Sequence, residues 1–171
     1  MLAFFVFAQA ATLRGSGQSA ADAAALAAVR EARDNLYEEF LTALGDERVG
    51  LSEIIAGESF AVGSACEEAQ RLAARNGAAL VGCSPLSGRL GYAVIIETND
   101  AVSQTVIPGV GSQRARAEAT AVMESLCEVR NGETEDDLPG LSCEGGSWEL
   151  EPDEGASGIN PRDLFSIHLE D

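Results

Sequence analysis

The first 44 residues form one long run that favours a single helix, and this run constrains the fold more than any other feature. Gln18 to Leu44 contains many strong helix formers and few breakers. Gly15 and Gly17 weaken a helix locally, by about 1 kcal/mol each relative to alanine, and do not end it. Gly45 supplies a stop signal. We therefore expect one helix from Met1 to Leu44.

Small residues recur along one face of this expected helix. Ala20, Ala24, Ala28 and Ala32 are spaced four apart, so their side chains share one face. Such a strip lets a second helix approach closely, as small residues do between membrane helices. A general alanine bias of the chain would produce the same pattern. We predict a helix-packing face here, and an amphipathic helix from Val29 onward.

The beginning of the run is apolar. Leu2 to Leu13 carries no charge and contains three phenylalanines. As a helix it covers roughly 18 Å, against about 30 Å for a bilayer core. A signal peptide is disfavoured, because no basic residue precedes the segment and Arg14 follows it. The segment is either the outer end of a longer transmembrane helix or a helix buried in a partner. We favour the first, which predicts about 8 to 12 further apolar residues encoded upstream of Met1.

The remaining patterns predict an α+β fold, in which the long helix packs on a small antiparallel sheet with one or two short helices. Ser64 and Glu67 have the spacing of a capping box, and Asn76-Gly77 ends that helix. We expect short helices at 51–56 and 64–76, strands at 78–83, 91–98, 102–107, 114–123 and 164–169, and a hairpin within 142–150 that turns at Gly145-Gly146.

Two features decide how the expected sheet is arranged. Asn99-Asp100 is typical of a turn, so residues 102–107 would pair back on 91–98 as a hairpin. Arg114 to Met123 alternates small and polar residues over ten positions. Alanine favours a helix, but a period of two indicates a strand, and we follow the period. Its small face would lie under the long helix and its charged face would meet water.

The four cysteines are Cys66, Cys83, Cys127 and Cys143. They form no C-x-x-C pair, and zinc sites need closely spaced soft ligands, so we predict no metal site. An even number of cysteines in a small domain fits two disulfides formed in an oxidising compartment. Four buried reduced thiols are the alternative. Of the three possible connectivities we favour Cys66–Cys83 and Cys127–Cys143, because each pair flanks a compact unit.

The net charge is −17, and all 11 basic residues are arginine. This charge repels nucleic-acid phosphates, so we predict no nucleic-acid partner. Residues 124–171 hold 14 acidic and 2 basic residues. The crowded carboxylates of residues 133–137 lack the spacing of a calcium loop, which favours a solubilising surface over a calcium site. We divide the chain into an N-terminal helix (1–44), an α+β domain (45–126) and an acidic, disulfide-containing extension (127–171).

No catalytic constellation is present in the sequence. His168 is the only histidine, and its apolar neighbours suggest a solvent-facing position on a strand. No G-x-S-x-G elbow and no Walker A loop occur, and no G-x-G-x-x-G follows a strand. We therefore predict no catalytic, cofactor-binding or metal-binding residues, no cofactor and no small-molecule substrate.

Two stretches resemble a known family. The first is Phe5 to Arg33, in which an apolar segment leads to Gln18 and then to the A-A-D-A-A-A-L-A block of residues 20–27. The second is Ala65 to Ile96, a helix followed by N-G-A, a strand and a cysteine. Together they are similar to actinobacterial Tad/Flp pilus-assembly proteins of the TadE/TadG-like group. The resemblance covers roughly two thirds of the chain, including the alternation from residue 114, which matches the final alanine-rich strand of those proteins.

The resemblance implies a pilin-like layout, with a membrane helix and a small domain on the outer face. It implies a non-catalytic component of a Tad/Flp-type pilus or secretion apparatus in the cell membrane, single-pass and mostly extracytoplasmic. Its partners would be other subunits, through the N-terminal helix, and the membrane, through Leu2 to Leu13. The family's upstream membrane segment and its D-x-S-x-S adhesion motif are both missing. The alternative is an anchored or secreted binding domain whose acidic lobe takes cations or a basic partner.

Overall fold

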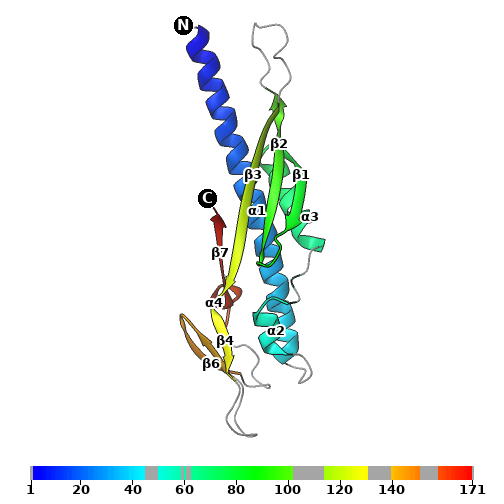
Figure 1. Ribbon diagram of the computed structural model, residues 1–171, viewed down its shortest axis with the longest axis vertical. Coiled ribbons are helices and arrows are strands. Elements are labelled where there is room, and N and C mark those ends of the chain that lie inside the picture. Colours follow the sequence, from blue (N-terminus) through cyan, green and yellow to red (C-terminus); the bar gives the residue numbers. More distant parts are fainter. Residues whose placement is uncertain are drawn as a thin grey trace.

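One helix, α1 (Leu2–Leu44), runs along most of the molecule and organises everything else (Figure 1). The computed structural model describes residues 2–44, 50–58, 60, 63–101, 114–130, 140–150 and 158–170. The predicted α+β class is confirmed, because the long helix packs on an antiparallel sheet accompanied by short helices. The other elements are α2 (Leu51–Ile55), α3 (Gly63–Arg75), α4 (Pro161–Leu164), β1 (Ala78–Pro85), β2 (Gly91–Ala101), β3 (Arg114–Ser125), β4 (Cys127–Arg130), β5 (Gly140–Cys143), β6 (Gly146–Glu149) and β7 (Phe165–Glu170).

The prediction of one uninterrupted helix up to Leu44 is confirmed. Gly17 lies inside it at a close approach to the sheet. A Cβ at Gly17 would lie 3.4 Å from Cγ2 of Thr98 and 3.8 Å from Cβ of Ala117. The helix therefore lies close to β2 and β3 at this point. The predicted stop, Gly45, falls outside the described residues.

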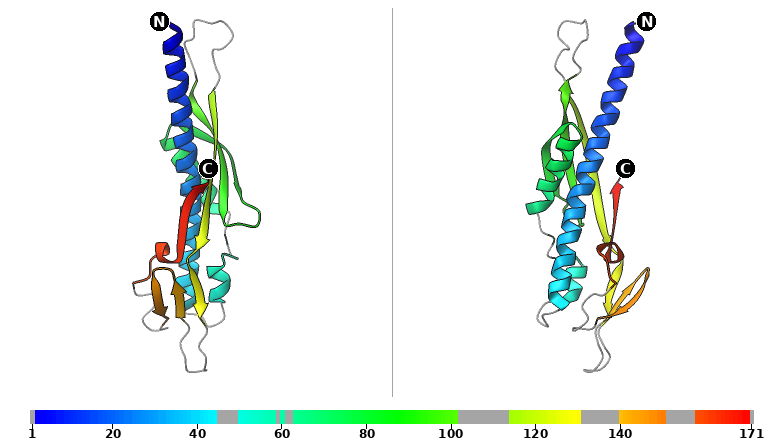
Figure 2. Two further views of the ribbon diagram at one scale, coloured as in Figure 1. Left: turned by 60° about the vertical axis from the view of Figure 1, so that its left-hand side comes forward. Right: turned by 180° about the vertical axis from the view of Figure 1, so that it is seen from behind.

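The strands form two sheets. The larger has the order β1-β2-β3-β7, antiparallel throughout, and the smaller has the order β4-β5-β6. Helices α1 and α3 cover the same face of the larger sheet, as the two views in Figure 2 show. The core lies between these helices and that sheet. Its largest fully buried side chains are Tyr92, Phe40, Phe165, Leu36 and Ile96.

The strand predicted from the alternation after Arg114 is confirmed as β3. Arg114, Arg116 and Glu118 are exposed, whereas Ala121 and Met123 are buried. The period of two therefore outweighs the helix propensity of alanine, because one face of the strand packs under α1.

The predicted turn at Asn99-Asp100 is wrong, because β2 continues through both residues to Ala101. Tertiary hydrogen bonds hold this end of the strand extended. The N–H of Asn99 donates to the carbonyl of Gly77 at 2.8 Å, and Thr98 Oγ1 accepts from the N–H of Ala115 at 3.0 Å. The expected strand at 102–107 lies outside the described residues, and β3 pairs with β2.

Three element boundaries also differ from the predictions. Ser64 does not precede its helix but lies in its first turn, and its hydroxyl accepts a hydrogen bond from Asn35 at 2.8 Å. The small hairpin is confirmed, but it turns at Glu144-Gly145, one residue early. The last expected strand begins at Phe165, because Leu164 closes the short helix α4.

The predicted division at residue 127 needs correction, because the acidic extension supplies a strand to the larger sheet. Strand β7 pairs with β3 over the whole of its length, from Thr120↔Glu170 to Ser125↔Phe165. Leu141, Leu150 and Leu164 are buried in the same core as α1. Residues 127–171 are therefore partly built into the α+β domain and do not form a separate unit.

Candidate interaction surfaces

The N-terminal end of α1 extends beyond the ends of the strands (Figure 1). A Cβ placed on Gly15 would meet no atom within 4 Å, whereas one placed on Gly17 meets both β2 and β3. From Gly17 onward the helix packs on the sheet. The 15 residues from Leu2 to Ser16 precede this point, which corresponds to about 22 Å of helix. None of the helices in the described residues is both long enough and apolar enough to cross a membrane.

The predicted helix-packing face lies inside the protein's own core. Ala20, Ala24, Ala28 and Ala32 are all buried, with at most 1 % of their surface exposed. Helix α1 packs against α3, β3 and β2, and the buried residues of α3 are three alanines spaced four apart: Ala65, Ala69 and Ala73. The face is therefore covered within the chain and is not available to another subunit.

All four cysteines are in disulfides. Cys66 on α3 is joined to Cys83 on β1, with their Cα atoms 5.9 Å apart. Cys127 on β4 is joined to Cys143 on β5, directly opposite it in register. These are the two pairings favoured from the sequence. The first bond holds α3 on the sheet, and the second holds the smaller sheet together.

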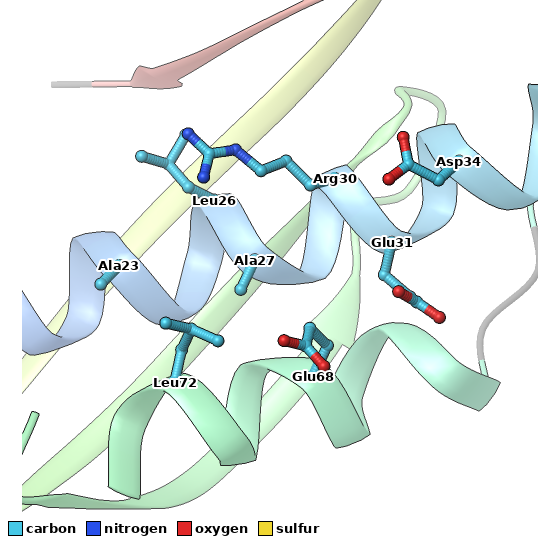
Figure 3. Close-up of a pocket in the computed structure, with 8 residues that line it drawn as sticks. All are labelled: Ala23, Leu26, Ala27, Arg30, Glu31, Asp34, Glu68 and Leu72. Carbon is cyan, nitrogen blue, oxygen red and sulfur yellow. The ribbon is translucent and has the colours of Figure 1, made fainter. Parts of the chain in front are cut away.

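A shallow groove of about 360 Å³ lies between α1 and α3 (Figure 3). Its floor is apolar and its rim is charged, with Glu31 of α1 and Glu68 of α3 on facing sides. Glu68 is paired with Arg71, and Asp34 with Arg33. No histidine, cysteine or serine lines the groove. Its lining residues are Ala23, Leu26, Ala27, Arg30, Glu31, Asp34, Glu68 and Leu72.

The titratable groups with shifted pKa values lie elsewhere. Arg89 donates two hydrogen bonds to the carboxylate of Glu170, one of them from Nη2 to Oε2 at 3.0 Å. These bonds lower the pKa of Glu170 and raise the pKa of Arg89. Burial raises the pKa of Tyr92. His168 is exposed on β7, as predicted. Across the described ranges, no three His, Cys, Asp or Glu side chains gather in a way that could hold a metal ion.

Sequence reasoning did not predict the groove or the Arg89–Glu170 pair. Both depend on which elements become neighbours, and the two members of the pair are 81 positions apart. No family model matches the chain, and no curated protein or solved structure is similar to it.

Proposed function

We propose that the protein is a non-catalytic component of a Tad/Flp-type pilus or secretion apparatus, held at the cell membrane by the N-terminal end of α1. The observation that carries this proposal is the division of α1 at Gly15 to Gly17. Before this point the helix extends past the strands, and its segment from Leu2 to Leu13 is uncharged and apolar. After it the helix is packed into the domain. A single helix thus carries the apolar end away from an otherwise acidic domain.

The disulfides support an extracytoplasmic location for the domain, because such bonds persist mainly in oxidising compartments. The burial of α1 from Gly17 onward supports anchorage rather than loose tethering. Because the helix is fixed along one side of the core, the domain is held in a defined position relative to the apolar end. Because the alanine face is used internally, contacts with other subunits are expected at the apolar end of α1.

Membrane attachment is tested by fractionating cells that produce the full chain. We expect the protein in the membrane pellet, resistant to carbonate and released by detergent. Phe7→Asp places a charge in the apolar end and should move the protein to the supernatant. Leu41→Asp is the matched control, because Leu41 is an exposed apolar residue at the other end of α1. Wild-type protein in the supernatant, or equal behaviour of the two variants, would refute the anchor.

The role in an apparatus needs a separate test. Deletion of the gene in its own host should abolish surface pili or secretion by the apparatus. The wild-type chain and Leu41→Asp should restore assembly, and Phe7→Asp should not. Unchanged pili and secretion after the deletion would refute the role while leaving the anchor intact, and would favour the binding-domain alternative.

A further inference from the structure

Strand β3 is longer than the strand that covers its outer edge. It runs from Arg114 to Ser125, and β7 pairs only with Thr120 to Ser125. Figure 1 shows β7 ending partway along β3. No strand of the described ranges therefore lies beside the outer edge of residues 114–119. An open edge presents unpaired main-chain donors and acceptors and readily takes up another strand.

Hydrogen bonds establish which residues of β3 direct their main-chain N–H and C=O groups toward β2. The N–H of Met123 donates to the carbonyl of Leu90 at 2.8 Å, just before β2 begins. The N–H of Ala115 donates to Oγ1 of Thr98, within β2. The main-chain groups of odd-numbered residues in β3 therefore point toward β2.

The main-chain N–H and C=O groups of even-numbered residues in β3 point to the opposite, outer side, away from β2. The N–H of Leu126, just past β3, donates to the carbonyl of Leu164, next to β7. The carbonyl of Glu118 accepts a hydrogen bond from Nε2 of Gln18 at 3.1 Å. Beyond the end of β7, this side-chain amide occupies the place that a neighbouring strand's N–H would take. The open edge thus displays the main-chain groups of Arg114, Arg116 and Glu118.

The sequence of this edge is complementary to itself. Residues 114–118 read R-A-R-A-E, and all three charged side chains are exposed. None of them forms an ion pair with another described residue. If two such strands pair antiparallel about Arg116, each Arg114 lies opposite the Glu118 of the other copy. Opposite charges at directly opposed positions stabilise an antiparallel pair.

We propose that two copies of the chain associate through this edge, with Arg116 on the two-fold axis. Arg116 then exchanges two main-chain hydrogen bonds with its counterpart. Each Glu118 N–H donates to the Arg114 carbonyl of the other copy. Ala115 and Ala117 meet at the closer, non-hydrogen-bonded positions, where their small side chains offer no steric barrier. The incoming Arg114 N–H takes the place of the Gln18 amide at the Glu118 carbonyl, and the exposed Gln18 side chain keeps its hydrogen bond to Asp22.

Charge favours a second copy as the occupant. The edge carries two arginines and one glutamate within a chain of net charge −17. The two Arg116 side chains repel each other, but Glu97 lies beside Arg116 in register on β2 and offsets that repulsion. The smaller sheet, from the acidic part of the chain, lies at the other end of the molecule (Figure 1). The contact is short, so association is weak and reversible. It does not depend on the proposed role in a pilus.

A cysteine on the two-fold axis tests the proposal. Arg116→Cys, in the full chain purified in mild detergent with its native disulfides intact, should form a symmetric intermolecular disulfide under mild oxidation. Glu97→Cys is the matched control, because it lies directly beside Arg116 but one strand farther from the axis. We expect dimers from Arg116→Cys at least about tenfold faster than from the control. Equal rates would overturn the proposal, and would leave an extended segment of another protein as the candidate occupant of the edge.

Charge exchange gives an independent check in the Arg116→Cys background. Arg114→Glu and Glu118→Arg each turn both opposed pairs into like charges, so each should slow cross-linking by roughly tenfold. The double exchange restores both attractive pairs and should return the rate to within about threefold of the parent. Circular dichroism and intact mass verify that every variant is folded and disulfide-bonded. A double variant as slow as the single ones would rule out the antiparallel register.

Discussion

The hydroxyl of Tyr37 on α1 donates a hydrogen bond to the carbonyl oxygen of Ile159 at 2.7 Å, across 122 positions of sequence. Ile159 is buried and immediately precedes the capping box of α4, formed by Asn160 and Asp163. The bond therefore fixes the point at which the chain turns into α4 and β7. It ties the last strand of the sheet to the helix that begins the chain.

Replacing Tyr37 with phenylalanine tests this link. The ring is kept and only the hydroxyl is lost, which leaves the carbonyl of Ile159 without its partner. We expect the free energy of unfolding to fall by about 1 kcal/mol. Urea denaturation followed by circular dichroism measures the change. An unchanged midpoint would show that the hydrogen bond contributes nothing to stability.

The packing of α1 against α3 predicts intolerance to larger side chains. Ala69 of α3 is completely buried, whereas Ala74 on the same helix is exposed. Ala69→Leu should destabilise the protein by about 1–3 kcal/mol, because the backbones must move apart. Ala74→Leu is the control and should change stability by less than about 0.5 kcal/mol. Thermal unfolding distinguishes the two, and equal effects would contradict the close helix packing.

The disulfides should each contribute substantially to stability. Replacing Cys66 and Cys83 together with alanine removes a closed loop with a sequence separation of 17. The expected loss is about 3 kcal/mol, mostly through the greater freedom of the unfolded chain. Cys127 and Cys143, separated by 16, should give a similar value.

The pairing itself is checked without mutation. Peptide mapping under non-reducing conditions should recover the Cys66–Cys83 and Cys127–Cys143 peptides. Free thiols, or any crossed pairing, would contradict the arrangement described above.

The burial of Tyr92 leads us to expect that the protein loses stability at alkaline pH. Burial raises the pKa of Tyr92 in the folded protein, because the charged phenolate is poorly solvated there. The unfolded chain therefore ionises first, and stability is fully present below the unfolded pKa of about 10. It is lost as the pH rises from there through the folded pKa. Tyr92→Phe should remove this part of the pH dependence, measured as the free energy of unfolding between about pH 8 and 11. Parallel curves for the two proteins would contradict it.

Local sequence patterns predicted the helices and strands themselves better than they predicted which of these elements lie side by side. The long helix, α3 and the strand from Arg114 all follow from propensity and periodicity, which act over a few residues. The turn predicted at Asn99-Asp100 was wrong because hydrogen bonds to other strands and turns hold β2 extended there, against the local turn preference of these residues. Tertiary contacts of that kind leave no trace in a short window of sequence.

The order of the strands in the sheet, and which surfaces are buried, were harder to predict because both depend on tertiary contacts. Nothing near Phe165 indicates that β7 pairs with β3, because that choice depends on which edge remains uncovered. The spacing of Ala20 to Ala32 predicted a packing face, but not that the protein's own core would cover it. The open edge at Arg116 became visible only when the lengths of β3 and β7 could be compared.

The return of β7 to β3 has a consequence for how the protein acquires its structure during synthesis. The Cys66–Cys83 loop and the β1–β2 pairing involve residues close in sequence, so they can form while the chain is still growing. Residues 120–125 of β3, and the part of α1 that contacts β7, remain uncovered until Phe165 to Glu170 has emerged from the ribosome. The growing chain therefore passes through a stage with an exposed sheet edge, at which it is most prone to aggregate or to need a chaperone.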